Sequence, residues 1–244
     1  MRDDKLNSMP PRPSADRIPR ALLARWFVRE VLGVVILGVI LFVSAGRIDW
    51  PAAWVLLGIT LLWVFAMALA IIPRHPDLIA ERLGPRKGGK RWDVVILSLF
   101  GLATIVKSVI AGLDQRFGWT VDFPPGLQQV SVILLLTGYG LIVWATAANA
   151  FFAQTVRIQT ERGHKVVTGG PYRMVRHPGY LGTIVTELAA PLLLASWWAL
   201  LIGIIAAGLF VIRTHFEDRT LQDELEGYQA YTNKTRYRLV PGIW

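Results

Sequence analysis

Cysteine is absent from this chain of 244 residues. Its absence excludes disulfide bonds, a thiolate nucleophile and metal sites with cysteine ligands. Charged residues are scarce too, because Asp, Glu, Lys and Arg make up 18% of the sequence, whereas soluble domains contain about 25%. No glycine-rich G-x-G-x-x-G loop follows a strand-like segment, and strand and helix patterns do not alternate. The dinucleotide-binding fold of soluble methyltransferases and reductases is therefore excluded.

Histidine is also scarce. The four histidines show no metal-ligand spacing and no Ser-His-acid arrangement is evident, so we expect neither a metal centre nor a serine hydrolase. The net charge is +9, which in a soluble chain would indicate nucleic-acid binding. Because no basic patch is interleaved with aromatic residues, we expect no nucleic-acid partner.

What the chain has in quantity is apolar sequence, since 53% of its residues are hydrophobic. A helix that crosses a bilayer needs about 20 mostly apolar residues. The last apolar run is too long for one crossing, so we expect it to form two helices, broken at Pro191 and turning near Ala195 and Ser196. The sequence predicts an all-α membrane bundle of about six transmembrane helices. The apolar runs lie at 26–46, 51–72, 94–113, 127–153 and 180–212.

The basic residues are distributed unevenly between the loops of this bundle. Of 26 Lys and Arg, 23 lie in the N-terminal tail, the 73–93 loop, the 154–180 loop and the segment from Arg213 onward. Cytoplasmic loops of membrane proteins carry such an excess. We therefore expect both termini in the cytoplasm, with the basic flanks touching anionic membrane lipids.

Three regions are predicted from these patterns. A polar basic tail covers 1–25, and four transmembrane helices with the 73–93 loop cover 26–153. A region with a polar loop, a helical hairpin and a C-terminal helix covers 154–244. The 73–93 loop is expected to form a short helix at Asp77–Leu83 and a flexible Gly/Lys turn, and to rest on the lipid headgroups.

Chemistry-bearing residues crowd between 156 and 182. Thr168-Gly-Gly-Pro indicates a turn, after which Arg-His-Pro-Gly-Tyr at 176–180 precedes an apolar helix. Pro178 lacks an N–H and disfavours helix at His177, so this imidazole is expected at a break in the backbone. Free backbone groups at such a break bind polar ligands, which positions exposed to lipid do not tolerate.

A third polar stretch, 213–227, continues from the last apolar run. On a helix Arg219 and Asp223 are four residues apart, as are Leu221 and Leu225, and Gly227 is a suitable stop. Spacing alone favours an amphipathic surface helix with solvated ion pairs.

These segments together resemble a known family. The string GPYRMVRHPGYLG, the apolar helical hairpin after it, EDRTLQDELEGYQAY and the ending RYRLVPGIW are similar to the isoprenylcysteine carboxyl methyltransferase family, and more distantly to phospholipid N-methyltransferases. The resemblance covers about residues 150–244. It implies an integral membrane methyltransferase that uses S-adenosylmethionine and has its active site at the cytoplasmic face.

The resemblance also implies roles for individual residues. Arg219 corresponds to an arginine that contacts the substrate, a lipophilic methyl acceptor entering from the bilayer. An acidic cofactor contact falls on Asp223 or its neighbour Glu224. The remaining cofactor contacts fall on His164, Lys165, Val166, Val167, Tyr172, His177, Pro178, Gly179 and Tyr180. The 13-residue step between the two histidines matches the family.

At one position the chain departs from the family. Arg157 stands where eukaryotic members have a glutamine that contacts the cofactor, and Gln154 and Gln159 are alternative candidates. Arg173 and Arg176 are interpreted as topology charges.

Two intramembrane charges leave alternatives open. Glu187 either forms a polar site or pairs with Lys107, its only basic counterpart within a span.

The function predicted is methyl transfer from S-adenosylmethionine to a lipophilic substrate, most simply O-methylation of a carboxylate, since a carboxylate needs no general base. The alternatives are N-methylation of a phospholipid or another lipophilic amine, a membrane reductase with a nicotinamide cofactor, and a non-catalytic membrane protein that retains the fold.

Overall fold

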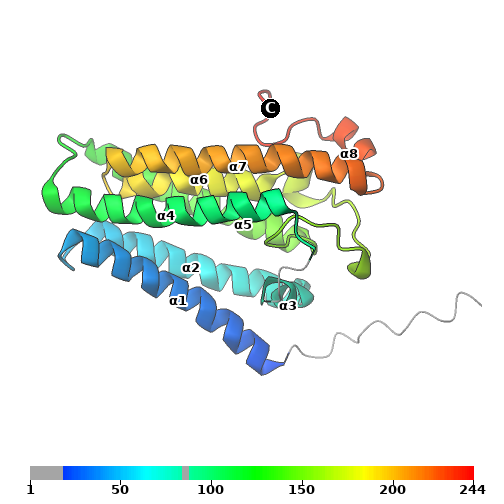
Figure 1. Cartoon of the computed structure of the whole chain (residues 1–244), viewed down its shortest axis with the longest axis horizontal. Coiled ribbons are helices and arrows are strands. Elements are labelled where there is room, and N and C mark those ends of the chain that lie inside the picture. The colour runs from blue at the N-terminus through cyan, green and yellow to red at the C-terminus, as the bar shows by residue number, and fades with distance from the viewer. Residues whose placement is uncertain (1–18, 84–87) are drawn as a thin grey trace, which may run out of the picture.

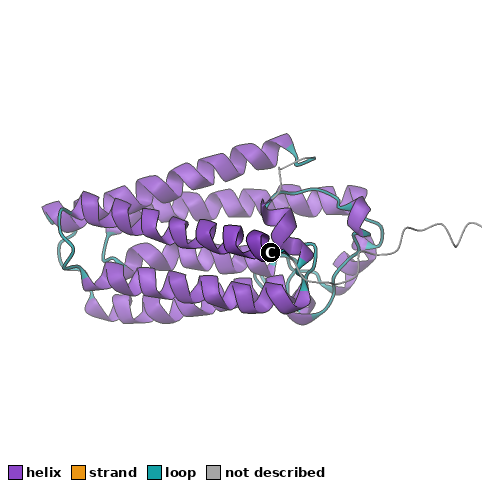
Figure 2. Cartoon of the chain, turned by 90° about the horizontal axis from the view of Figure 1, so that it is seen from below, coloured by secondary structure: helices purple, strands orange, loops and turns teal. Residues whose placement is uncertain are grey.

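The computed structural model describes residues 19–83 and 88–244, so most of the predicted N-terminal tail and residues 84–87 of the predicted Gly/Lys turn lie outside it. The described part consists of helices joined by loops, without strands (Figure 2). In chain order its elements are α1 (Arg20–Ala45), α2 (Pro51–Arg74), α3 (Asp77–Leu83), α4 (Arg91–Phe117), α5 (Pro125–Ala148), the short 3-10 helices η1 (Thr160–Arg162) and η2 (Gly170–Arg173), α6 (Pro178–Leu193), α7 (Trp197–Glu224) and α8 (Tyr228–Lys234).

Six of these helices lie roughly side by side along the long axis (Figure 1). By length and composition α1, α2, α4, α5 and α7 are each apolar enough to cross a membrane, and α6, with 16 residues, is the sixth member of the bundle. Side chains on the outer faces are strongly exposed, for example Leu69 at 75% and Ile133 at 65%. An apolar surface of this extent suits lipid rather than water. The all-α polytopic bundle is therefore confirmed.

The boundaries of the helices follow from local sequence. Pro51 occupies the first turn of α2, where its missing N–H costs nothing. The predicted turn between the last two spans is confirmed at 194–196, where Ala195 adopts a positive φ of 55° and the Ser196 hydroxyl accepts the Ala199 N–H at 3.0 Å.

Pro191, by contrast, does not break the chain. It lies inside α6, which runs on to Leu193. A proline in a helix cannot donate to the carbonyl four residues earlier, here that of Glu187. Gly203 of α7 lies against this carbonyl, so closely that a Cβ on Gly203 would sit 2.6 Å from its oxygen. The helix therefore continues through Pro191, with α7 packed closely against the carbonyl that the proline leaves without its usual donor. The pattern of apolar residues does not indicate this contact between helices.

The two intramembrane charges meet in the interior. Lys107 on α4 donates to Glu187 on α6, and their residues are only 6% and 8% exposed. Neither residue lines the two cavities described below. The geometry favours the structural alternative, an ion pair that joins two spanning helices.

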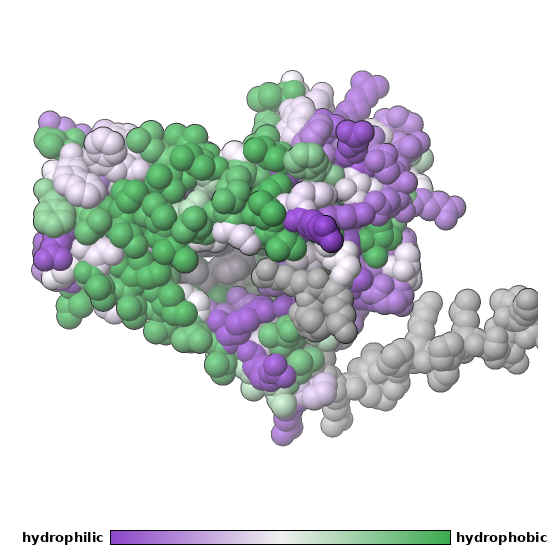
Figure 3. Space-filling model, viewed as in Figure 1, coloured by the Kyte–Doolittle hydropathy of each residue, from purple (hydrophilic) through white to green (hydrophobic). Residues whose placement is uncertain are grey.

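Polar residues gather at one end of the bundle, which we call the polar end (Figure 3). It is formed by α3, α8, the long loop 149–177 and the segment 235–244 (Figure 1). The bounds predicted for α3 are confirmed. The acids of α3 bind the long loop, since Glu81 accepts from Arg157 at 2.8 Å and Asp77 pairs with Arg162. Its position on the lipid headgroups stays a prediction.

Candidate active site

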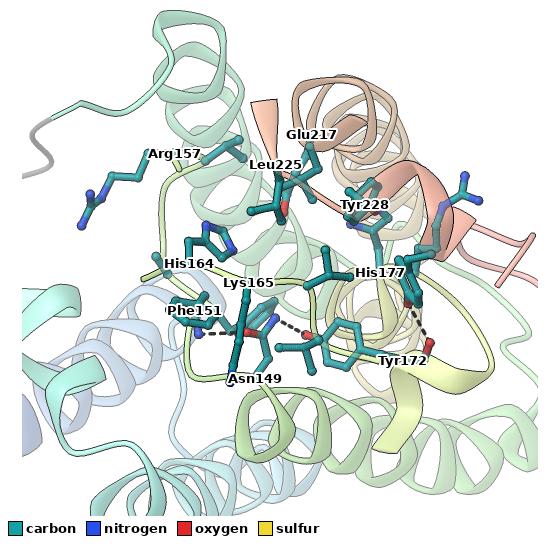
Figure 4. A pocket seen from close by; sticks show the side chains of 18 of the residues that line it. Asn149, Phe151, Arg157, His164, Lys165, Tyr172, His177, Glu217, Leu225 and Tyr228 are labelled. Atoms are coloured by element: carbon teal, nitrogen blue, oxygen red, sulfur yellow. Dashed lines mark hydrogen bonds between the residues drawn. The ribbon is translucent and has the colours of Figure 1, made fainter. Parts of the chain in front are cut away.

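A cavity of about 710 Å³, counting the space open to solvent, lies at the polar end. We call it the first cavity. The 149–177 loop, the last turns of α7 and α8 enclose it. Figure 4 shows His164, Lys165 and Phe151 on one side, with Tyr172 and His177 on the other. Ligand sites are typically concave, with an apolar lining and a few convergent polar groups, and the wall of this cavity combines aliphatic, aromatic and charged side chains in that way.

The structure brings most of the sequence-predicted residues to this cavity. Those in its wall are His164, Lys165, Val166, Val167, Tyr172, His177 and Tyr180. Outside the wall lie Pro178, Gly179, Arg219, Asp223 and Glu224. Pro178 begins α6, and Gly179 packs so tightly against the Phe152 ring that a Cβ would lie 2.4 Å from it.

Arg219, Asp223 and Glu224 lie away from the first cavity, so their predicted contacts with substrate and cofactor stay predictions. The α7 side chains that reach the cavity are Glu217, Leu221 and Leu225. At 3.6 residues per turn, Arg219 is rotated by about 200° from Glu217, which places it on the far side of the helix. Arg219 and Asp223 are accordingly exposed.

Glu224 is also engaged elsewhere, because it pairs with Lys90 at 2.5 Å. The acid that faces the cavity is Glu217, which sequence reasoning missed. The sequence contained a signal for Glu217, because Glu217, Leu221 and Leu225 are spaced four residues apart and therefore lie on the same face of a helix.

Asp218 is the central buried anion of the site, and it too was missed. It is fully buried, and its carboxylate accepts from Arg176 at 2.8 and 3.0 Å and from the Tyr228 hydroxyl at 3.0 Å. It also accepts from His177 Nε2 at 3.3 Å and from Arg238 at 2.8 Å. A carboxylate can only accept, so Nε2 of His177 carries a proton. Burial and the charge of Asp218 raise the pKa of Tyr228, which keeps that hydroxyl protonated.

Arg176 therefore has a structural role beyond the topology charge predicted from the sequence. Besides Asp218, its guanidinium reaches the backbone carbonyls of Thr235 and Arg236 at 3.0 and 2.9 Å. Each donor of a buried guanidinium needs such a partner, because unmatched polar groups are costly in the interior.

The segment 235–244 closes the same network from outside. The N–H groups of Arg176 and His177 donate to the carbonyls of Tyr237 and Arg238, each at 2.9 Å. The Trp244 ring lies 4.9 Å from the Arg238 guanidinium. The backbone conformation of the Arg-His-Pro-Gly-Tyr segment at 176–180, which we call the His177 motif, thus depends on residues about sixty positions later in the chain.

Tyr180 is held from three directions. Its hydroxyl donates to Glu217, its ring stacks on His177, and the Arg213 guanidinium lies 4.7 Å from the ring centre. Arg213 is fixed in turn by the fully buried Asp93 at 2.7 Å. Such packing and hydrogen bonding keep a side chain in one geometry, as a reaction site requires.

His164 is a neutral hydrogen-bond donor at the opposite wall. Its Nδ1 accepts the Gln159 N–H at 3.3 Å, which leaves the proton on Nε2. Its ring stacks on Phe151 at 4.5 Å. Burial, followed by the positive charges of Arg162 and Arg157, lowers the pKa of the His164 imidazole to about 4.

This lowered pKa predicts a pH dependence of stability. An unfolded histidine has a pKa near 6.5, so between about pH 6.5 and 4 the unfolded chain binds the proton and the folded chain does not. Stability is therefore expected to fall as the pH drops through this window. We expect His164→Asn to flatten the dependence of Tm on pH between 7 and 4, and the exposed His215→Asn to leave it unchanged. Equal slopes for wild type and His164→Asn would contradict the assignment.

The structure shows where the three residues lie that are candidates to replace the glutamine of the family, Arg157, Gln154 and Gln159. Arg157 lines the cavity, but its guanidinium is bound by Glu81 and Glu161. Gln159 is buried and holds the loop by donating to the Phe151 carbonyl at 2.8 Å. Gln154 lies in the wall of a different cavity.

The second cavity adjoins the first and extends along the spanning helices α2, α4, α5 and α7. It encloses about 910 Å³, counting open space, and shares Phe152, Ala153 and Tyr180 with the first cavity. Figure 3 shows a hollow on this face of the molecule, with an apolar surface above it and hydrophilic residues along its lower edge. Its polar wall residues are Arg82, Gln154, Thr183 and Arg213, and its apolar ones include Trp63, Met67, Leu97, Phe100, Ile142 and Phe210.

Comparison with known proteins matches this part of the chain to one family. The sequence model of the isoprenylcysteine carboxyl methyltransferase (ICMT) family matches residues 130–223, which include the loop and the α7 acids that form the first cavity. A "Probable protein-S-isoprenylcysteine O-methyltransferase" of Oryza sativa subsp. indica is 25% identical over 141 residues, covering 55% of this chain and 71% of the relative.

A second kind of relative aligns over more of the chain. A "Methanethiol S-methyltransferase" of Pseudomonas sp. (strain GM41(2012)) is 30% identical over 207 residues, covering 77% of this chain and 74% of the relative. "Protein-S-isoprenylcysteine O-methyltransferase B" of Arabidopsis thaliana is 29% identical over 112 residues, covering 46% of this chain and 53% of that protein.

Proposed function

The chain belongs to the isoprenylcysteine carboxyl methyltransferase family and is a membrane methyltransferase, and we propose that it methylates the carboxylate of a lipophilic acceptor with S-adenosylmethionine as donor. The observation that carries the proposal is the meeting of two cavities at Phe152, Ala153 and Tyr180. The first cavity opens at the polar end and has charged side chains such as Lys165 and Glu217 in its wall, whereas the second extends along the spanning helices and has large apolar side chains such as Phe100 and Phe210 in its wall.

The groups around the first cavity suit S-adenosylmethionine. When bound, this cofactor supplies a methyl group on a positively charged sulfur. Glu217 offers a carboxylate for a positive group, and His164 offers a neutral N–H donor. Aliphatic side chains, Val166, Leu221 and Leu225, form an apolar wall for the adenine ring. His177 and Tyr180 are held by Asp218 and Arg213, so they meet a ligand without reorganising.

The second cavity receives the acceptor from the bilayer. Methyl transfer from a sulfonium is an in-line displacement, for which a protein mainly positions the reactants and excludes water. The ring of Phe152 and the phenol of Tyr180 stand at the junction and set the approach of the two ligands. A carboxylate attacks without losing a proton, so no base is required of these residues.

The active site faces the cytoplasm in this proposal. The support is the distribution of charge, since 23 of the 26 Lys and Arg belong to segments on one side of the predicted topology. These segments include the loop and helix that enclose the first cavity.

The cofactor site predicts the effect of a conservative change. Glu217→Gln is expected to weaken binding of S-adenosylmethionine roughly 10- to 100-fold, because hydrogen bonds to charged groups contribute about 1.5–3 kcal/mol. Titration calorimetry of the detergent-purified protein measures the affinity. The matched control is Glu226→Gln, an exposed acid just beyond α7. Wild-type affinity in Glu217→Gln would remove this acid from the cofactor site, and no binding by the wild type would reject the proposed donor.

Methylation of a lipophilic thiol is the second candidate. It is favoured by the Pseudomonas relative and by the Tyr180–Glu217 hydrogen bond, which offers a proton acceptor that a thiol requires and a carboxylate does not. The two reactions leave different products. Radiolabelled methyl groups transferred in membranes that overexpress the protein should be released by alkali from a methyl ester, whereas alkali leaves a thioether intact.

A further inference from the structure

Arg82, the penultimate residue of α3, lies in the wall of the second cavity, in contact with Phe152, a residue that both cavities share. Its Nη2 donates to the Phe152 carbonyl at 3.3 Å, and its guanidinium carbon lies 5.9 Å from the Phe152 ring centre. Its Nε is enclosed and has no hydrogen-bond partner among residues 19–83 and 88–244. Enclosed N–H groups without partners are rare, because each costs about 1–3 kcal/mol. The unmatched donor therefore indicates a missing acceptor.

Charge leads to the same conclusion. The other arginine of the second cavity, Arg213, is neutralised by the buried carboxylate of Asp93 at 2.7 Å. Within the described ranges no carboxylate lies within ion-pair distance of Arg82. Burial, the largest cause, lowers the pKa of its guanidinium to about 10, so the group stays charged at neutral pH. The Glu30 carboxylate acts on Arg82 from beyond ion-pair distance and itself pairs with Arg29, so among the described residues the positive charge of Arg82 in the second cavity has no carboxylate bound directly to it.

The rest of the cavity limits what can supply the negative charge. Its wall is mostly aromatic and aliphatic, with Trp63, Phe100 and Phe210 among the larger side chains. An inorganic anion would leave this surface unfilled, whereas a hydrophobic chain would cover it and gain about 25 cal/mol for each Å² removed from water. The complementary ligand is an amphiphile with one anionic group.

We propose that Arg82 binds the anionic group of the acceptor and so selects acceptors by charge. The inference rests on the proposed function, in which the acceptor occupies the second cavity. A guanidinium binds a carboxylate through two parallel N–H groups, and Nε is one of the two that form this fork. Its place beside Phe152 holds the carboxylate at the boundary with the first cavity. Arg82 lies outside the region matched to the family, so the family's motifs do not assign it.

The test compares two probes that differ only in charge. They are N-acetyl-S-farnesylcysteine, a lipophilic carboxylate, and its methyl ester. Binding to the full chain in neutral detergent is measured by thermal stabilisation at increasing probe concentration. The wild type is expected to bind the acid roughly 10- to 100-fold more tightly than the ester, as a charge-assisted hydrogen-bond pair implies. Equal affinities in the wild type would overturn the proposal.

Variants then assign the preference to the residue. Arg82→Gln is expected to reduce the acid-to-ester ratio to near one, with ester affinity and S-adenosylmethionine affinity unchanged. Arg82→Lys keeps the positive charge but lacks the two parallel N–H groups, so it should retain part of the preference for the acid over the ester. It also provides the test if Arg82→Gln does not fold. Arg25→Gln removes an exposed cation of α1 and is the matched control. A wild-type ratio in both Arg82 variants would overturn the proposal.

Two further measurements distinguish binding of the acceptor by Arg82 from binding of a membrane lipid and from the proposed methyl transfer. Phosphatidylglycerol is added in place of the acid, since a lipid headgroup also presents an anion, and stabilisation by the lipid alone would overturn the proposal. Methyl transfer to the acid is scored separately. An acid preference that depends on Arg82 in a protein that transfers no methyl group would reject the proposed function and still support the binding role.

Discussion

Replacing Asp218 by asparagine is expected to lower the free energy of unfolding by about 3–5 kcal/mol, the cost of leaving a buried charge without its partner. The amide preserves the shape of the carboxylate but not its charge. Arg176 would remain enclosed beside it, and the amide cannot accept from every donor that now converges on the two oxygens. This is one of the two largest effects expected from a single substitution.

Unfolding in denaturant, followed in detergent, measures the stability of the variant. Asp223→Asn is the matched control, because this exposed aspartate on the same helix should change stability by less than about 0.5 kcal/mol. Cofactor affinity should fall as well, because the single oxygen of the amide cannot accept from His177, Tyr228 and Arg176 in the way that the carboxylate does. A loss of less than about 1 kcal/mol in Asp218→Asn would show that Arg176 is stabilised by its carbonyl partners alone.

Lys107→Met is expected to destabilise the bundle by a similar amount, about 3–5 kcal/mol, because Glu187 is then left alone among spanning helices. The double variant with Glu187→Met should recover most of the loss, since buried ion pairs are often replaced by apolar residues at little cost. A double-mutant cycle of unfolding free energies measures the coupling between the two sites.

The exposed pair Lys90–Glu224 provides the control for this cycle. Lys90→Met should cost no more than about 1 kcal/mol, the usual limit for ion pairs in water. A double variant as unstable as Lys107→Met alone would contradict the structural role, and would indicate that Glu187 has a further partner in the bundle.

The bundle could be predicted because the bilayer sets the length of each crossing. Apolar runs of about 20 residues fixed the spans, and the turn at Ala195 followed from a run too long for one of them. Local signals also gave the bounds of α3. The role of Pro191 could not be predicted in this way, because it depends on how closely Gly203 approaches from another helix.

The candidate site was predictable where its residues are contiguous. His164 to Val167 and the His177 motif reach the first cavity as a single loop. On α7 the prediction chose Arg219 and Asp223 by likeness of sequence, while the phase of the helix selects Glu217. Motif spacing says little about phase, since a shift of two residues reverses the face of a helix.

Long-range partners were the least predictable part. Arg176 and Asp218 lie within segments that the sequence singles out, but their pairing joins residues 42 positions apart, and neither motif indicates it. Arg82 lies outside both segments. Their importance arises from burial, which converts a surface charge into a group that must be matched.

The pairing of the His177 motif with Tyr237 and Arg238 bears on how the protein is made. During synthesis every spanning helix of the described bundle leaves the ribosome before these two carbonyls do, because all of them precede residue 237 in the chain. The N–H groups of Arg176 and His177 have no acceptor until residue 238 has left the ribosome. The motif therefore acquires its final conformation only after residue 238 has been synthesised, so the wall of the first cavity is completed later than the helices that precede it in the chain.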